Sequence, residues 1–170
     1  MTKIYQMPEK ISITPAELKT LREKWGLSTQ WLAEQAGVQV RTVQFWESGR
    51  SAVPEDVAAL MLVTDMRLES TIDAAVEYIT SLEQPPTAVV LVRYKTDEDL
   101  HYYRPDMIEF SARTHGMVLA LTKSEIEIAL EDVNVRIVYL EPEQYEAWLK
   151  LTQKKDSEQA RAEWAGTLEI

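Results

Sequence analysis

The residues with the most specific chemistry lie together in the first third of the 170-residue chain. Between residues 39 and 48, arginine and glutamine are interspersed with apolar residues on the expected outer face of a helix. Arginine can donate two hydrogen bonds to guanine, glutamine can pair with adenine in the same way, and valine or phenylalanine can contact the methyl group of thymine. On spacing alone, an ordinary solvated helix face explains these residues equally well. The candidate base-reading residues are Gln39, Val40, Arg41, Gln44 and Phe45.

Four predicted helices would position this face. Polar capping residues precede the helical hydrophobic spacing and glycines follow it, which is the usual punctuation of short helices. The residues that punctuate the first three helices are Thr14, Glu17, Gly26, Ser28, Gly37 and Gly49. A small residue at Ala33, a left-handed turn at Gly37 and an apolar core residue at Val43 together predict a helix-turn-helix. Residues 55–84, which follow Pro54, form either one long helix or two helices with a bend.

Residues 14–66 resemble the helix-turn-helix domain of the XRE/Cro/lambda-repressor type. The segment Trp46-Glu47-Ser48-Gly49-Arg50 matches the ending of the third helix in that family. Residues 41–57 are similar to the anti-CRISPR-associated autorepressors of phages and to related bacterial regulators. The resemblance implies DNA binding through the third helix, a long fourth helix and a short C-terminal α/β segment that forms a dimer.

Candidate phosphate contacts lie near two helix ends. Backbone N–H groups and short polar side chains at a helix start can bind phosphate, which singles out Thr29 and Gln30, although capping alone also explains them. The resemblance implies that the loop carrying Arg50 and Ser51 lies over the phosphate backbone, whereas the alternative is a solvated arginine. Thr42 either contacts phosphate or only caps its helix.

The resemblance also implies a structural ion pair between Arg22 in the first helix and Glu47 at the end of the third. The alternative role for Arg22 is a contact with a DNA phosphate. The two roles differ in their consequence, because an ion pair within the fold supports stability whereas a phosphate contact supports binding.

The second half of the chain predicts a small α/β unit. Apolar runs rich in valine and isoleucine indicate strands at residues 88–94 and 135–140. Helices are expected at residues 111–132 and 142–151, although residues 118–121 could form a strand instead. The order strand, helix, strand, helix favours parallel strands. Two strands are marginal by themselves, so we expect them to pair with another chain or to pack on the long helix.

The predicted fold class is therefore α+β, with an all-α helix-turn-helix bundle followed by the small α/β unit. The expected organisation is an N-terminal arm (1–13), a DNA-binding domain that includes the long fourth helix (14–84), a dimerisation or partner-binding unit (86–151) and a polar, mobile tail (152–170).

Charge is distributed unevenly along the chain. The net charge is −10, yet residues 1–53 carry 7 Lys/Arg against 5 Asp/Glu, whereas residues 54–170 carry 11 against 23. Such asymmetry indicates one module that meets a polyanion and a second that does not. The chain has no cysteine, and its two histidines lie 14 residues apart without a matching ligand pattern. We therefore expect no catalytic residue, no metal and no cofactor.

These observations predict a cytoplasmic, sequence-specific DNA-binding repressor, because no apolar run of membrane or signal-peptide length is present. It would bind a palindromic operator in double-stranded DNA as a homodimer, with its own promoter as one candidate target. The alternative is an antitoxin-like interaction module whose acidic C-terminal part binds a partner protein. RNA binding through the same basic face stays open, and an enzyme is not expected.

Overall fold

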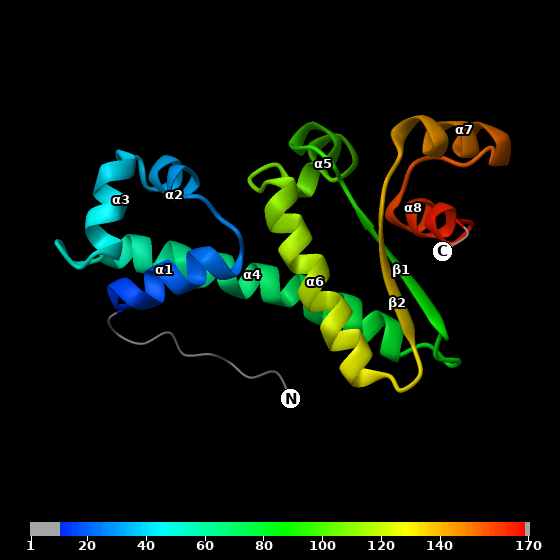
Figure 1. The fold of residues 1–170 in the computed structure, drawn as a ribbon, viewed down its shortest axis with the longest axis horizontal. Helices are drawn as coiled ribbons and strands as arrows, with labels where there is room; N and C mark the ends of the chain where they lie inside the picture. The colour runs from blue at the N-terminus through cyan, green and yellow to red at the C-terminus, as the bar shows by residue number, and fades with distance from the viewer. Residues whose placement is uncertain (1–10, 169–170) are drawn as a thin grey trace. The chain divides into compact units, whose positions relative to one another are not determined.

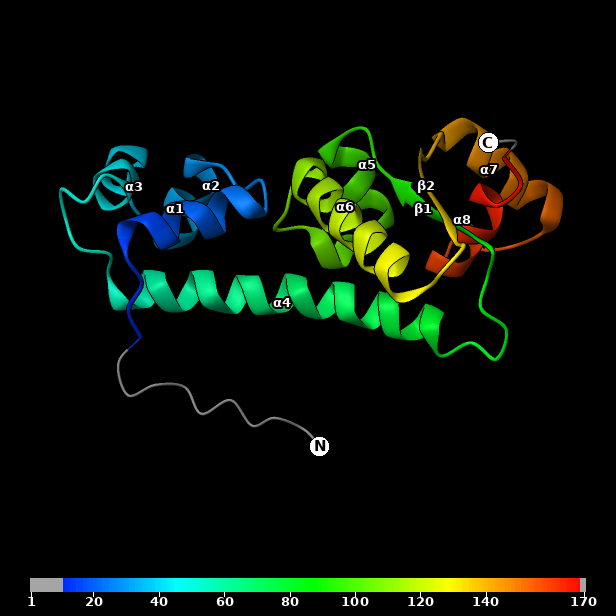
Figure 2. The ribbon, with the colours of Figure 1, turned by 60° about the horizontal axis from the view of Figure 1, so that its bottom comes forward.

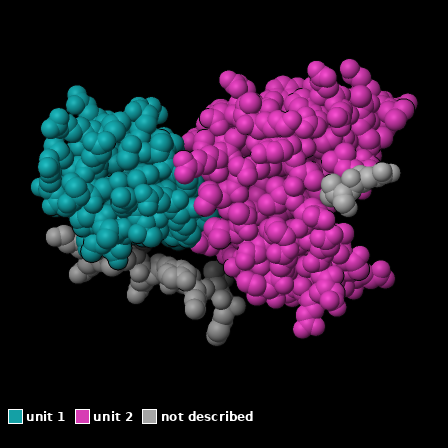
Figure 3. Space-filling model, viewed as in Figure 1, with its two compact units in different colours: residues 1–68 teal, residues 69–170 magenta. Residues whose placement is uncertain are grey.

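The computed structural model describes residues 11–168, and their contacts divide the chain into two compact units, residues 1–68 and residues 69–170 (Figure 3). The architecture is mostly helical with one small sheet, which confirms the α+β class. The expected arm lies outside the described residues except for residues 11–13. The domain boundary expected between residues 84 and 86 stays a prediction.

The first unit contains short helices whose ends follow from local hydrogen bonds. Its elements are α1 (Pro15–Lys24), α2 (Thr29–Ala36), α3 (Val40–Glu47) and the first part of α4 (Glu55–Thr80) (Figure 1). Thr14 Oγ1 accepts from the backbone N–H of Glu17 at 3.1 Å, and the Glu17 carboxylate accepts from the backbone N–H of Thr14 at 2.6 Å. This capping box satisfies backbone groups that a helix start leaves unpaired. Ser28 caps α2 by accepting from the backbone N–H of Trp31 at 2.9 Å.

Helix α4 is one continuous helix rather than two with a bend (Figure 2). Asp65 on α4 joins it to the end of α1, because its Oδ1 atom accepts from the indole N–H of Trp25 and from the ammonium of Lys24, both at 2.8 Å. Trp25 is fully buried, so this hydrogen bond satisfies an indole N–H that water cannot reach. The core of the unit comprises Leu18, Trp25, Leu27, Leu32, Ala33, Val43, Trp46, Val57, Ala58, Met61 and Leu68.

The second unit contains a two-stranded parallel sheet, as the order of elements predicts. Its elements after α4 are β1 (Ala88–Arg93), α5 (Asp97–Tyr103), the 3-10 helix η1 (Pro105–Met107), α6 (Ala112–Ala129), β2 (Asn134–Tyr139), α7 (Pro142–Thr152) and α8 (Glu158–Ala165). The strands pair in register from Ala88 opposite Asn134 to Arg93 opposite Tyr139. Residues 118–121 lie within α6, so the helical alternative for this segment is confirmed.

Helix α6 packs along both strands and α8 packs against β1. Buried aromatic rings fill the interior of this unit. Tyr103 stacks on Tyr94 with ring centroids 5.9 Å apart, and Tyr145 meets both Tyr103 and Trp164 edge to face at 5.8 and 5.7 Å. Such pairs stabilise a core beyond their buried area.

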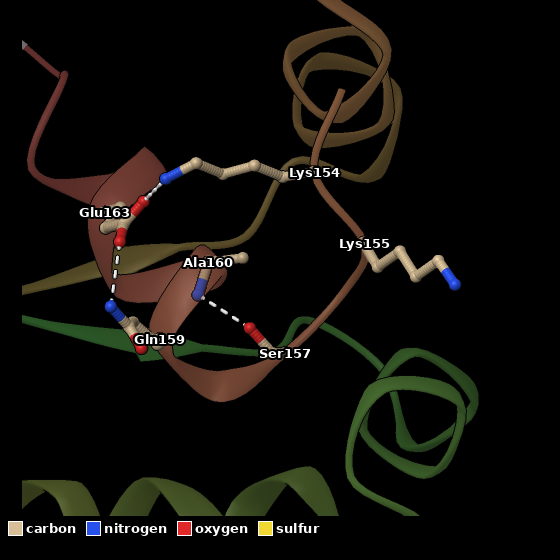
Figure 4. A pocket seen from close by; sticks show the side chains of 6 residues that line it. All are labelled: Lys154, Lys155, Ser157, Gln159, Ala160 and Glu163. Atoms are coloured by element: carbon tan, nitrogen blue, oxygen red, sulfur yellow. Dashed lines mark hydrogen bonds and ion pairs between the residues drawn. The ribbon is translucent and has the colours of Figure 1, made fainter. Parts of the chain in front are cut away.

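The expectation of a polar, mobile tail at residues 152–170 is corrected by a helix in this segment. Residues 158–165 form α8, and Trp164 and Ala165 are buried. Ser157 caps this helix by accepting from the backbone N–H of Ala160 at 3.0 Å. A shallow surface depression is lined by the start of α8 and the preceding loop (Figure 4). The polar composition of the segment did not indicate this helix, because only one face of α8 is buried.

Within residues 11–168, no helix is both long and apolar enough to cross a membrane.

We expect His115 in α6 to make the stability of the second unit depend on pH. It is 4% exposed, and its Nδ1 atom has no hydrogen-bond partner among the described residues. Burial, followed by the charges of Arg104 and Arg93, lowers the pKa of His115 from 6.5 to about 4. Between these values the unfolded chain binds a proton that the folded chain does not, so stability falls as the pH decreases.

We expect His115 to account for a loss of up to about 3 kcal/mol of folding free energy between pH 6.5 and pH 4. Urea unfolding at several pH values, compared with that of the His115→Gln variant, measures this contribution as the difference between the two pH profiles. Equal profiles over this range would contradict the lowered pKa.

Candidate nucleic-acid interface

Helices α2 and α3 are joined by a tight turn that determines which face of α3 is exposed. Gly37 ends α2 with φ 66° and ψ 34°, a left-handed conformation that a side chain disfavours. A Cβ atom at this position would meet no atom within 4 Å, so glycine is needed for the backbone conformation and not for space. Ala33 on α2 and Val43 and Trp46 on α3 are buried. Burial of these residues directs the opposite side of α3 to solvent.

The predicted base-reading residues lie at the start of α3 and along its exposed side. Gln39 is the N-cap residue, and it is exposed together with Arg41 and Gln44. Val40 and Phe45 are half-buried. An exposed row that carries both arginine and glutamine offers the hydrogen-bonding groups that read guanine and adenine in a major groove.

The predicted phosphate contacts divide into two groups. Thr29 is half-buried in the first turn of α2, and the exposed Gln30 donates its amide N–H to Glu34 at 2.6 Å. Arg50 and Ser51 are exposed beyond α3, in the loop that follows Gly49. Thr42 is half-buried in the first turn of α3 and belongs to neither group. Arg50 in the loop is therefore more accessible to a phosphate than Thr29, which is half-buried, or Gln30, which is hydrogen-bonded to Glu34.

A feature that our sequence analysis did not predict is a cluster of two cations on one aromatic ring. The guanidinium carbon of Arg41 lies 5.4 Å from the ring centroid of Phe45, and that of Arg50 lies 5.5 Å from the same centroid. Both distances are within the range of cation–π attraction. The spacing of four residues between Arg41 and Phe45 in a helix could have indicated the first contact. The second depends on the path of the loop.

Arg22 and Glu47 form a two-point ion pair between α1 and the end of α3. Arg22 Nε donates to Glu47 Oε1 at 2.5 Å, and Nη2 donates to Oε2 at 3.1 Å. Both side chains are 10% exposed, and Arg22 Nη1 also donates to the backbone oxygen of Leu27 at 2.7 Å. The hydrogen bond to Glu47 raises the pKa of Arg22 above its ordinary value. This geometry engages the guanidinium within the fold, away from the exposed side of α3.

Comparison with known proteins places this arrangement in a family. A family model described as a domain of unknown function (DUF4447) matches residues 7–168. The chain belongs to the DUF4447 family. The match extends over both compact units, so this DUF4447 chain carries its helix-turn-helix and its small α/β unit within one family domain.

Two curated proteins resemble parts of this DUF4447 chain. The Aca2 repressor of Pectobacterium phage ZF40 is 45% identical over 59 residues, which are 34% of this chain and 51% of that protein. A protein of Pyrococcus furiosus, whose name assigns it to the HTH-type transcriptional regulatory proteins, is 41% identical over 80 residues. That match covers 45% of this chain and 25% of the relative. The chain thus spans about half of the first relative and a quarter of the second. One name denotes a repressor and the other a transcriptional regulatory protein of the HTH type.

Proposed function

We propose that this protein is a sequence-specific DNA-binding repressor that reads a palindromic operator with α3 and binds it as a homodimer. The observation that carries the proposal is the arrangement of α3, whose exposed side bears Arg41 and Gln44 while Val43 and Trp46 are buried beneath. The partial similarity to proteins named as a repressor and as a regulator supports the same function. Repression would be steric, through occupation of a promoter, so no catalytic residue or cofactor is invoked.

A dimer follows from the size of the reading element. One helix in the major groove reads only a few base pairs, and paired half-sites lie about 34 Å apart along the duplex. The positive balance of residues 1–53 suits the approach to phosphates, whereas the acidic remainder of the chain does not. Because the binding module has few cations, we expect discrimination to depend on base contacts more than on charge.

The proposal is tested by selecting binding sites from random DNA duplexes with the full chain, then measuring the stoichiometry of the selected complex by analytical ultracentrifugation. We expect a palindromic consensus and two chains per duplex. No enrichment of any duplex would refute DNA binding, and one chain per duplex would refute the dimer. A second protein that co-purifies in stoichiometric amount would instead support a partner-binding role for the acidic half.

Substitutions on α3 and in its following loop are expected to have different effects. Arg41→Ala and Gln44→Ala should each weaken binding to the selected duplex by roughly 1–3 kcal/mol and relax the preference at one base position. Arg50→Ala should weaken binding to all duplexes about equally. It should also make the slope of log binding constant against log salt concentration less steep by about one per subunit. Competition titrations with single-mismatch duplexes at several salt concentrations measure both effects.

The matched control is Lys19→Ala, which removes the same charge from an exposed position on α1. It should leave base preference unchanged. If Arg41→Ala and Gln44→Ala also leave both affinity and preference intact, α3 is not the reading element and the proposal fails.

A further inference from the structure

The ring of Phe45 on α3 is in contact with two guanidinium groups. Arg41 lies one helical turn before Phe45 and its guanidinium carbon is 5.4 Å from the ring centroid. Arg50 lies beyond the end of the helix, and its guanidinium carbon is 5.5 Å from the same centroid. Both arginines are exposed, whereas Phe45 is half-buried. The ring is thus partly fixed by the fold while the two cations face solvent.

The loop after α3 brings Arg50 back to this ring. Gly49 has φ 74°, a left-handed conformation that reverses the chain direction. The backbone oxygen of Phe45 then accepts from the N–H of Arg50 at 2.9 Å and from that of Ser51 at 3.3 Å. A Cβ atom on Gly49 would make only an ordinary contact with Pro15 at 3.8 Å, so the backbone conformation is what favours glycine here. These hydrogen bonds anchor the loop beside the side chain that its arginine contacts.

We propose that Phe45 is a positioning residue that holds the guanidinium groups of Arg41 and Arg50 for contact with the DNA duplex. This inference rests on the proposed function, in which Arg41 reads a base and Arg50 contacts a phosphate. A long side chain loses rotational freedom when it binds, and a ring that restricts it beforehand reduces that loss. The role differs from the direct contact with a thymine methyl group that residue type alone suggests for Phe45.

The positioning role predicts effects that pass through the arginines. An exposed cation–π contact corresponds to roughly a 2- to 5-fold change in an equilibrium constant. Phe45→Leu, which keeps apolar volume but removes the ring, should therefore weaken binding by up to roughly 4- to 25-fold per subunit when both contacts are lost. Phe45→Tyr keeps a ring face and should remain within about 2-fold of the natural chain.

Double-variant cycles with the full chain and its selected duplex test this prediction. In the Arg41→Ala background, Phe45→Leu should weaken binding only by the share of Arg50, which is up to roughly 2- to 5-fold per subunit. The converse should hold in the Arg50→Ala background. With both arginines replaced, Phe45→Leu should change affinity by less than about 2-fold. Titrations at low salt keep these weak complexes within a measurable range.

Two results would overturn the inference. An undiminished effect of Phe45→Leu after both arginines are replaced would mean that Phe45 acts on DNA or on the fold directly. Loss of binding in Phe45→Tyr as large as that in Phe45→Leu would exclude the ring face as the cause. Thermal unfolding of each variant without DNA ensures that only folded protein is titrated. Failure of the natural chain to select any duplex would refute the proposed function, whereas additive cycles on a selected duplex would refute this inference alone.

Discussion

Arg22→Met is expected to destabilise the N-terminal helical unit by about 3–5 kcal/mol, because it leaves the carboxylate of Glu47 without its cation in a site that is 10% exposed. The backbone oxygen of Leu27 also loses its hydrogen bond from Arg22. Methionine fills part of the space of the arginine stem, so the lost charge is the main cause. For a unit of this size the midpoint of thermal unfolding should fall by more than about 10 °C, as measured by circular dichroism.

Two further variants separate this effect from a general loss of charge. Lys19→Met removes an exposed cation from the same helix, where Lys19 and Glu23 are 53% and 58% exposed, and should change stability by less than about 1 kcal/mol. The double variant Arg22→Met with Glu47→Met removes both charges and should recover much of the stability. An unchanged unfolding midpoint in Arg22→Met together with weakened DNA binding would assign Arg22 to a phosphate contact instead.

Asp156→Ala is expected to destabilise the second unit by roughly 2–4 kcal/mol, because it removes the acceptor shared by two buried donors. Arg161 Nη1 donates to both carboxylate oxygens of Asp156 at 2.7 Å, and the hydroxyl of Tyr145 donates to Oδ1 at 2.8 Å. The Arg161 side chain is 6% exposed and Tyr145 is fully buried. Because the Asp156 side chain is 39% exposed, water can partly replace the lost carboxylate. The expected destabilisation is therefore smaller than for a fully buried ion pair.

The neighbouring residue supplies the control for Asp156→Ala. Lys155 is exposed and its side chain points away from α8 (Figure 4), so Lys155→Ala should be close to neutral. Urea unfolding followed by tryptophan fluorescence reports on the change, since Trp164 on α8 is buried. Equal midpoints for the two variants would show that the Asp156 cluster does not secure α8.

The sequence predicted most reliably the features that depend on neighbouring residues. The capping box of Thr14 and Glu17 and the left-handed Gly37 define helix ends through contacts within a few residues, so α1 and α2 could be anticipated. The parallel pairing of β1 and β2 followed from the order of elements, which restricts chain topology. The exposed side of α3 followed from its helical spacing once Val43 and Trp46 were assigned to the core.

The tertiary structure alone decided features that join distant residues. Helix α8 forms in a polar segment because Trp164 packs on Tyr145 and Arg161 pairs with Asp156, and composition does not report such partners. The contact of Arg50 with Phe45 depends on the loop path after Gly49. Capping and turn signals act within three or four residues, so the local sequence is sufficient to predict them. Burial and ion pairing require surfaces that exist only when the chain has folded.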